Sequence, residues 1–157
     1  MRTNFKFIGI EENYNHLFGL SEKELAKQNA VKMIVDKKHS YPCRVSLEDA
    51  EIGEEVILFP FHHHKTTSPY QSTGPIFIRK NAKKARLDIN EVPEMLLHRL
   101  LSLRIYNTQG MMIDAKTIKG EKLKTEIEEI FSNIQANYIH VHNSGPGCYN
   151  CQVNRIQ

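Results

Sequence analysis

Residues 121–134 read EKLKTEIEEIFSNI, and they contain the clearest helix signal in the chain. Its apolar side chains recur at a spacing that gathers them on one face of a helix, while lysine and glutamate fill the opposite face. These apolar residues are Leu123, Ile127, Ile130, Phe131 and Ile134. A helix with a single apolar face has to bury that face against another element. We therefore predict a helix over residues 121–134 that packs on a sheet.

Two further segments carry helix signals. In LSEKEL, residues 20–25, Ser21 can accept from the amide of Glu24, and the Glu24 side chain can accept from the amide of Ser21. This capping box predicts a short helix over residues 22–28. Pro93 suits the first turn of a helix, and Met95, Leu96 and the leucines after them recur with helical spacing. They predict a second helix over residues 93–100.

Short apolar segments between turn-forming residues predict strands. Their ranges are 31–35, 43–47, 55–61, 76–79, 102–106, 111–118, 138–143 and 149–154. Within 43–47, alternation places Cys43, Val45 and Leu47 on one face and leaves Arg44 on the other. Residues 62–69, HHHKTTSP, are polar and end at a proline, which predicts a loop. About eight short strands and about three helices without regular alternation predict an α+β fold with a mostly antiparallel sheet.

Composition narrows the class of protein. The chain has 157 residues, 21 basic and 18 acidic side chains, and a net charge of +3, which fits one domain over residues 1–157. This charge is too small and too dispersed to indicate nucleic-acid binding. No apolar run approaches the ~20 residues that cross a bilayer, and the first ten residues lack a signal-peptide core, so we expect no membrane association and a cytoplasmic location. Three cysteines in such a chain are expected to be reduced thiols.

The residues with the most chemistry lie near the C-terminus, in IHVHNSGPGCYNC at 139–151. On a strand, His140 and His142 point to the same side, about 7 Å apart. The glycine-rich turn that follows can bring Cys148 and Cys151 back beside them. Two imidazoles and two thiolates make a tetrahedral zinc site, so the expected metal ligands are His140, His142, Cys148 and Cys151.

The same segment allows other interpretations. Cys148 could act as a nucleophile activated by His140 or His142, with the backbone amides of 145–148 facing a developing negative charge. Cys148 and Cys151 could instead form a redox pair, although such pairs normally open a helix. In a purely structural interpretation the histidines line a hydrogen-bonded sheet face and the cysteines pack as small apolar residues. No phosphate-binding or dinucleotide-binding glycine motif points to a nucleotide. The sequence leaves open whether the protein is an enzyme.

Several further segments have recognisable sequence motifs. They are PCRVSLEDA (42–50), GEEV (53–56), SPY (68–70), GPIFIR (74–79), GMMIDA (110–115), and IHVHN (139–143) with PGC (146–148) and Cys151. In these the chain resembles an uncharacterised bacterial family, domain of unknown function 1203, over most of its length. The resemblance implies no activity, because none is assigned to that family.

The family-like segments indicate which polar residues could meet in space. They are Arg44, Tyr70, Arg79, Asp114, His140, His142 and Cys148. If Arg44 and Arg79 converge with Asp114 on the histidine strand, they form a pocket for a small carboxylate or phosphate, because a guanidinium holds such anions through two hydrogen bonds. We therefore expect a small-anion-binding or enzyme-like domain. The alternatives are a non-catalytic protein-interaction module and a structural zinc site.

Overall fold

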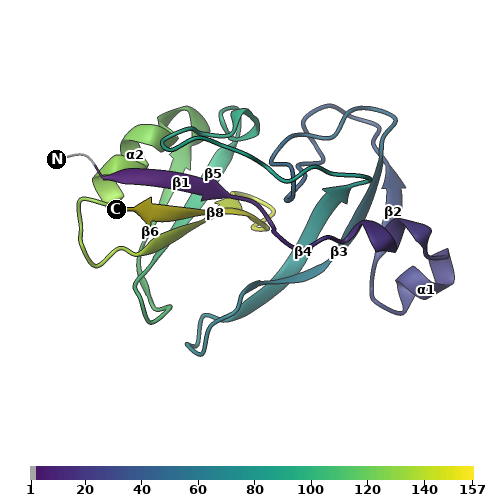
Figure 1. Ribbon diagram of the computed structural model, residues 1–157, viewed down its shortest axis with the longest axis horizontal. Helices are drawn as coiled ribbons and strands as arrows, with labels where there is room; N and C mark the ends of the chain where they lie inside the picture. Colours follow the sequence, from purple (N-terminus) through teal and green to yellow (C-terminus); the bar gives the residue numbers. More distant parts are fainter. Residues whose placement is uncertain (1–2) are drawn as a thin grey trace.

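The protein is built from two antiparallel sheets that lie side by side along its long axis (Figure 1). The computed structural model describes residues 3–157. The larger sheet has the strand order β1-β8-β7-β5-β6, and the smaller has the order β2-β3-β4. Within this part of the chain the strands are β1 (Asn4–Ile8), β2 (Val31–Ile34), β3 (Glu55–His64), β4 (Ser72–Arg79), β5 (Leu100–Tyr106), β6 (Met112–Lys119), β7 (Tyr138–Asn143) and β8 (Tyr149–Ile156).

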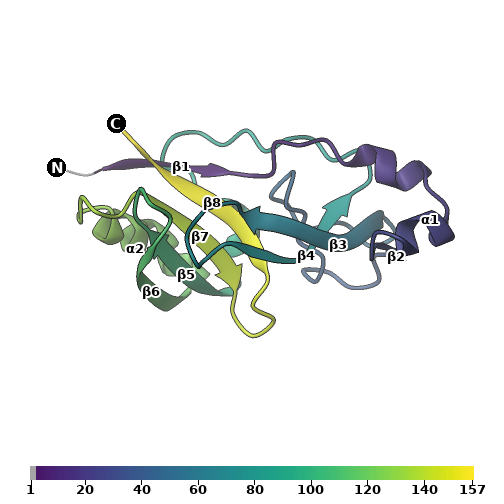
Figure 2. The same cartoon turned by 90° about the horizontal axis from the view of Figure 1, so that it is seen from below.

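Helix α2 (Leu123–Ile130) covers one face of the larger sheet, and α1 (Glu22–Ala26) lies at the far end of the smaller one (Figures 1 and 2). Leu123, Ile127 and Phe131 are buried in one cluster with apolar residues of β5 and β7. The predicted packing of an amphipathic helix on a sheet is therefore confirmed. The helix is shorter than expected, because a 3₁₀ turn (Gly120–Lys122) precedes it and Ile134, beyond its end, is 85% exposed.

The capping box at the start of α1 forms as the sequence predicts. Ser21 Oγ accepts from the amide of Glu24 at 3.1 Å, and Glu24 Oε1 accepts from the amide of Ser21 at 3.1 Å. The box holds because its contacts are local and need no distant partner. The strands predicted at 102–106 and 111–118 also form, and they pair antiparallel as β5 and β6.

Three sequence predictions are wrong. Residues 93–100 form a 3₁₀ turn (Glu94–Leu96) and the start of β5, so the described residues contain two α-helices rather than about three. Residues 43–47 make a tight turn in which the Leu47 amide donates to Cys43 O at 3.0 Å, and Leu47 has a φ of +55°. The alternation of apolar and polar residues in this turn is the same as in a strand, which explains the wrong prediction. Residues 62–64 belong to β3 rather than to a loop.

No helix in residues 3–157 has the length and apolar character that crossing a bilayer requires. The three cysteines, Cys43, Cys148 and Cys151, are free thiols.

Candidate functional site

The two faces of the larger sheet differ in chemistry, and the strand register fixes which residues lie on each. Ile139 and Val141 of β7 face the apolar core beneath α2. His140 lies opposite Arg104 of β5 and Gln152 of β8, and His142 lies opposite Ser102. Directly opposite residues in an antiparallel pair share a face. The two histidines therefore project from the same face, as the sequence predicts, and this is the face that α2 does not cover.

The end of β3 crosses from the smaller sheet onto this polar face (Figure 2). His64 anchors it: Nδ1 donates to Tyr70 O at 2.7 Å, and Nε2 lies 2.6 Å from the hydroxyl of Tyr138. The neighbouring His63 ring stacks on Tyr149, with centroids 4.9 Å apart and planes 6° from parallel. The polar tip of β3 is thus held against β7 and β8.

This crossing brings His63 together with His140 and His142. One ring nitrogen of each lies within 4.8 Å of a nitrogen on the other two. Among the described residues, three buried ring nitrogens have no hydrogen-bond partner: Nδ1 of His63, Nδ1 of His140 and Nε2 of His142. We call this group the three-histidine cluster.

The other ring nitrogens of the strand histidines fix their orientation. His140 Nε2 donates to Gln152 Oε1 at 2.9 Å, and the amide of that glutamine is itself oriented because its nitrogen donates to Asn154 Oδ1 at 2.7 Å. His142 Nδ1 donates to the carbonyl oxygen of Gly147 at 2.9 Å. Each neutral ring is therefore left with a lone pair on its unpartnered nitrogen. Metal-binding histidines are commonly oriented by such outer hydrogen bonds.

Burial keeps all three imidazoles neutral at physiological pH. Loss of solvent lowers the pKa of His140 to about 3, despite its hydrogen bond to Gln152. For the same reason the pKa of His63 falls to about 4, and so does the pKa of His142. Neighbouring positive charges add to the effect. Because neutral imidazole is the form that ligates metals, no proton has to be removed before binding.

Arg104 places a positive charge beside this cluster. It shares the face of His140, is half-buried, and its charge contributes to the lowered pKa of His63 and of His142. Within residues 3–157 its guanidinium makes no hydrogen bond or ion pair. Arg104 is therefore free to bind an anion.

A cavity of about 460 Å³ leads to the cluster from the side of β1. The histidines of β3 and His140 line it, together with Tyr138, Tyr149 and Gln152 and with loop residues 9–12. A small molecule or ion can therefore reach His63 and His140 without disturbing the core.

The structure does not bring the predicted cysteine ligands to these histidines. Cys151 lies opposite Val141 and so faces the apolar core, where it is fully buried and burial raises the pKa of its thiol. The register shift between β7 and β8, after Val141, separates it from the histidine face. The Cys148 thiol accepts from Arg44 Nη2 at 3.2 Å and from Asn143 Nδ2 at 3.5 Å. His63 takes the place that the sequence analysis gave to the cysteines.

Arg44 has a structural role rather than the expected ligand-binding one. It is 1% exposed, because residues 43–47 fold into a turn instead of a strand with a solvated face. Its Nε donates to Tyr149 O at 2.8 Å and its Nη1 to Pro42 O at 2.5 Å. With these contacts and the Cys148 thiol, all three of its nitrogens have partners. Arg44 therefore joins the turn to the start of β8.

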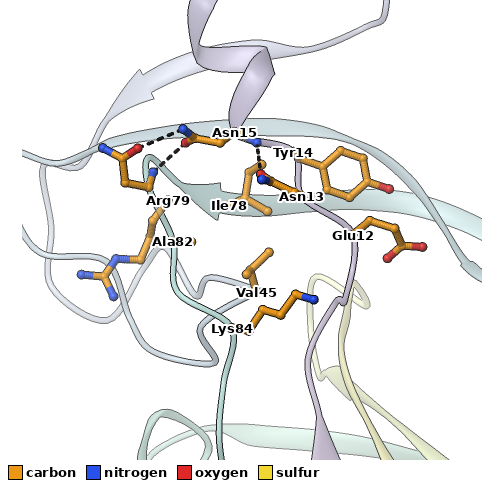
Figure 3. A pocket seen from close by; sticks show the side chains of 10 residues that line it. Glu12, Asn13, Tyr14, Asn15, Val45, Ile78, Arg79, Ala82 and Lys84 are labelled. Carbon is orange, nitrogen blue, oxygen red and sulfur yellow. Dashed lines mark hydrogen bonds between the residues drawn. The ribbon is translucent and has the colours of Figure 1, made fainter.

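Arg79 is committed to an ion pair. Its Nε and Nη2 donate to the two carboxylate oxygens of Glu54 at 2.7 and 2.5 Å, and Nη1 contacts Glu48. It lines a separate cavity of about 330 Å³, where Figure 3 shows it with Glu12 and Lys84 and with no histidine or cysteine. Its charge is already neutralised, so it is not available to an anion at the histidines.

Neither Asp114 nor the Tyr70 side chain belongs to the three-histidine cluster. Asp114 is on the edge strand β6 opposite Ile105, which places it on the α2 side of the sheet, and its Oδ1 accepts from the amide of Ala115 at 2.8 Å. The Tyr70 side chain is 38% exposed, and its carbonyl oxygen is the atom that holds His64. Arg44, Arg79 and Asp114 therefore do not form the expected anion pocket.

Two residues of the site were not predicted from the sequence, His63 and Arg104. His63 lies in the polar run assigned to a loop, and three consecutive histidines show no alternation that would extend the preceding strand. Arg104 lies in a strand whose alternation of Leu101, Leu103 and Ile105 already placed it on the polar face.

Residues 40–155 match the model of a family described as protein of unknown function, DUF1203. The chain belongs to the DUF1203 family. The match includes His63, Arg104, His140 and His142. No curated protein and no solved structure matches the chain. Membership of DUF1203 confirms the resemblance seen in the sequence and assigns no activity, so the function has to be argued from the site.

Proposed function

We propose that this DUF1203 protein binds a divalent transition metal at the three-histidine cluster and uses it to hold a small anion. One observation carries the proposal: the neutral imidazoles of His140 and His142, which are buried, and of His63, which is half-buried, converge, and each has an unpartnered nitrogen. A buried polar atom without a partner costs on the order of 1–3 kcal/mol. A metal ion bound to His63, His140 and His142 would remove this cost at all three nitrogens.

The ligand set indicates the class of metal. Imidazole nitrogens suit zinc, copper, nickel and iron, whereas magnesium and calcium prefer oxygen. Zinc–nitrogen bonds of about 2.0–2.1 Å in a tetrahedron place the nitrogens about 3.4 Å apart, so binding draws the three rings together from their present spacing. Three protein ligands leave the fourth position of zinc open. This pattern is typical of a site that binds or transforms a ligand rather than of a closed structural site.

Arg104 supports an anion as the ligand at the open position. A metal and a guanidinium on the same side of a sheet attract a carboxylate or phosphate, and arginine can bind two of its oxygens at once. This assigns to Arg104 the anion-binding role that the sequence analysis gave to Arg44 and Arg79. In this proposal the three histidines bind the metal, and Arg104 binds the anion.

The test is a zinc titration of untagged, chelator-treated protein. His140→Gln keeps the bond to Gln152, and His142→Asn keeps a donor for the carbonyl of Gly147, but each removes a metal ligand. We expect each variant to lose one equivalent of bound zinc per chain, measured by calorimetry and elemental analysis. His16→Asn, at an exposed histidine outside the cavity lining, is the matched control and should bind as the parent does. Unchanged zinc stoichiometry in both ligand variants would overturn the proposal.

The anion is tested separately with cobalt in place of zinc. Adding phosphate or acetate should change the visible absorption of the cobalt protein, because an anion at the fourth position alters the ligand field. Arg104→Met should weaken this response at least tenfold while metal binding persists, and Arg104→Lys should restore part of it. An equal response in the parent and Arg104→Met would show that Arg104 holds no anion.

A further inference from the structure

A second group of potential ligands lies outside the three-histidine cluster and shares no residue with it. It consists of His39 and Asp49, both in the connection between β2 and β3, and of His98, just before β5. The His39 side chain is 65% exposed and that of His98 37%, whereas that of Asp49 is 14% exposed. The two imidazoles are therefore open to solvent, whereas the Asp49 carboxylate is largely shielded from it.

Three atoms of this group form an equilateral triangle. His39 Nδ1 and His98 Nε2 each lie 3.2 Å from Asp49 Oδ2, and the two nitrogens lie 3.2 Å from each other.

Hydrogen bonds alone cannot satisfy all three contacts. A carboxylate oxygen only accepts, so both nitrogens have to carry a proton in order to bond Asp49 Oδ2. Two N–H groups then face each other across 3.2 Å. If either nitrogen gives up its proton, its lone pair faces the carboxylate oxygen instead. Every assignment of protons therefore leaves at least one repulsive contact.

A cation at the centre of the triangle resolves this conflict, because all three atoms then act as electron-pair donors to it. Ligands at about 2.0–2.1 Å around a tetrahedral zinc are about 3.3–3.4 Å apart. The observed separations of 3.2 Å are within about 0.2 Å of that spacing. The three atoms therefore already occupy one face of a metal tetrahedron, more closely than the atoms of the three-histidine cluster do.

The carboxylate is oriented as a metal ligand would be. Arg99 Nη2 donates to Asp49 Oδ1 at 2.6 Å and to the carbonyl oxygen of His39 at 3.0 Å. Arg99 Nη1 donates to the carbonyl oxygen of Met95 and, at 3.2 Å, to Asp49 Oδ2. Arg99 thus orients the Asp49 carboxylate through both of its oxygens and connects the segments that carry His39 and His98. Metal-ligating carboxylates are normally held by such outer hydrogen bonds.

We propose that His39 Nδ1, Asp49 Oδ2 and His98 Nε2 form a second, independent site for a divalent transition metal of the zinc class. Two imidazoles and one carboxylate suit zinc, cobalt, nickel and iron(II). The remaining coordination positions face solvent and the adjoining cavity of about 1050 Å³, which all three side chains line. The site therefore has open positions for water or an exchangeable ligand.

The experiment isolates this site in a chain that lacks the other one. Untagged protein carrying His140→Gln and His142→Asn is stripped with chelator and titrated with Co²⁺. We expect about one equivalent to bind, with the intense visible absorption of tetrahedral cobalt. Adding His98→Ala, or separately His39→Ala, should abolish that absorption and lower the affinity at least a hundredfold.

His39 and His98 are chosen because both are exposed, whereas a change at Asp49 would strand Arg99. His98→Ala is the cleaner of the two changes, because His39 has a φ of +59°, where alanine is strained. His16→Ala, also on an exposed histidine, is the matched control and should leave cobalt binding unchanged. The proposal is overturned if the double variant binds no cobalt, or if it binds equally well after His98→Ala. Failure of the three-histidine cluster would instead show as unchanged stoichiometry between the parent and the double variant.

Discussion

Acid should destabilise the metal-free protein through His140 and His142. In the folded protein their pKa values are about 3 and about 4, against 6.5 for an unperturbed histidine. Below pH 6.5 these two histidines therefore bind protons in the unfolded chain but stay neutral in the folded one. The free energy of unfolding then falls as the pH falls toward 4, and above about pH 7 these two groups contribute no pH dependence.

The slope follows from the number of protons involved. One additional proton bound by the unfolded state corresponds to about 1.4 kcal/mol per pH unit. His140 and His142 together give up to about 3 kcal/mol per pH unit near pH 5. His63 adds less, because more of it is in contact with solvent.

Urea unfolding followed by circular dichroism from pH 4.5 to 7.5, with a chelator present, measures this slope. His140→Gln and His142→Asn should each reduce it by roughly 1.4 kcal/mol per pH unit relative to the parent, so the contribution of the carboxylates cancels in the difference. His16→Asn, on an exposed histidine, serves as the control. Equal slopes in the parent and in both cluster variants would refute the burial argument.

Three further predictions concern stability and reactivity. Phe131→Ala, at a side chain 1% exposed, should lower the free energy of unfolding by roughly 3–5 kcal/mol in urea, and a loss under about 1 kcal/mol would contradict the core assignment. Arg44→Met should cost roughly 2–5 kcal/mol, since it strands buried carbonyl groups, and an unchanged urea midpoint would count against this. Without reductant, three thiols should react after unfolding, whereas in the native protein Cys148 should react before the buried Cys43 and Cys151; fewer than three would indicate a disulfide.

Local signals in the sequence predicted structure best where the structure needs only local contacts. The capping box at Ser21 and the apolar face through Ile127 both depend on residues a few positions apart, and both form. Helical spacing after Pro93 failed, because the same apolar residues serve a 3₁₀ turn and then a strand paired with β6 and β7. Which of these forms depends on distant partners that no local pattern contains.

Only part of the site could be predicted from the sequence. Alternation along a strand places His140 and His142 on one face, and this requires only the period of a strand. Cys151 could not be excluded, because the register shift that turns it to the core arises where β8 pairs with β7. His63 could not be found as a ligand, because its position depends on a strand of one sheet ending over the face of another.

The architecture explains why a metal would affect the whole molecule. The first half of β3 is fixed in the core of the smaller sheet by Ile57 and Phe59, and its end carries His63 to the larger sheet. A metal bound to His63 on β3 and to His140 and His142 on β7 would therefore join the two sheets. Binding to the folded state alone at a hundredfold excess over the dissociation constant stabilises a protein by about 2.7 kcal/mol. Because the ligands come from both sheets, that stabilisation acts on their association as well as on the cluster itself.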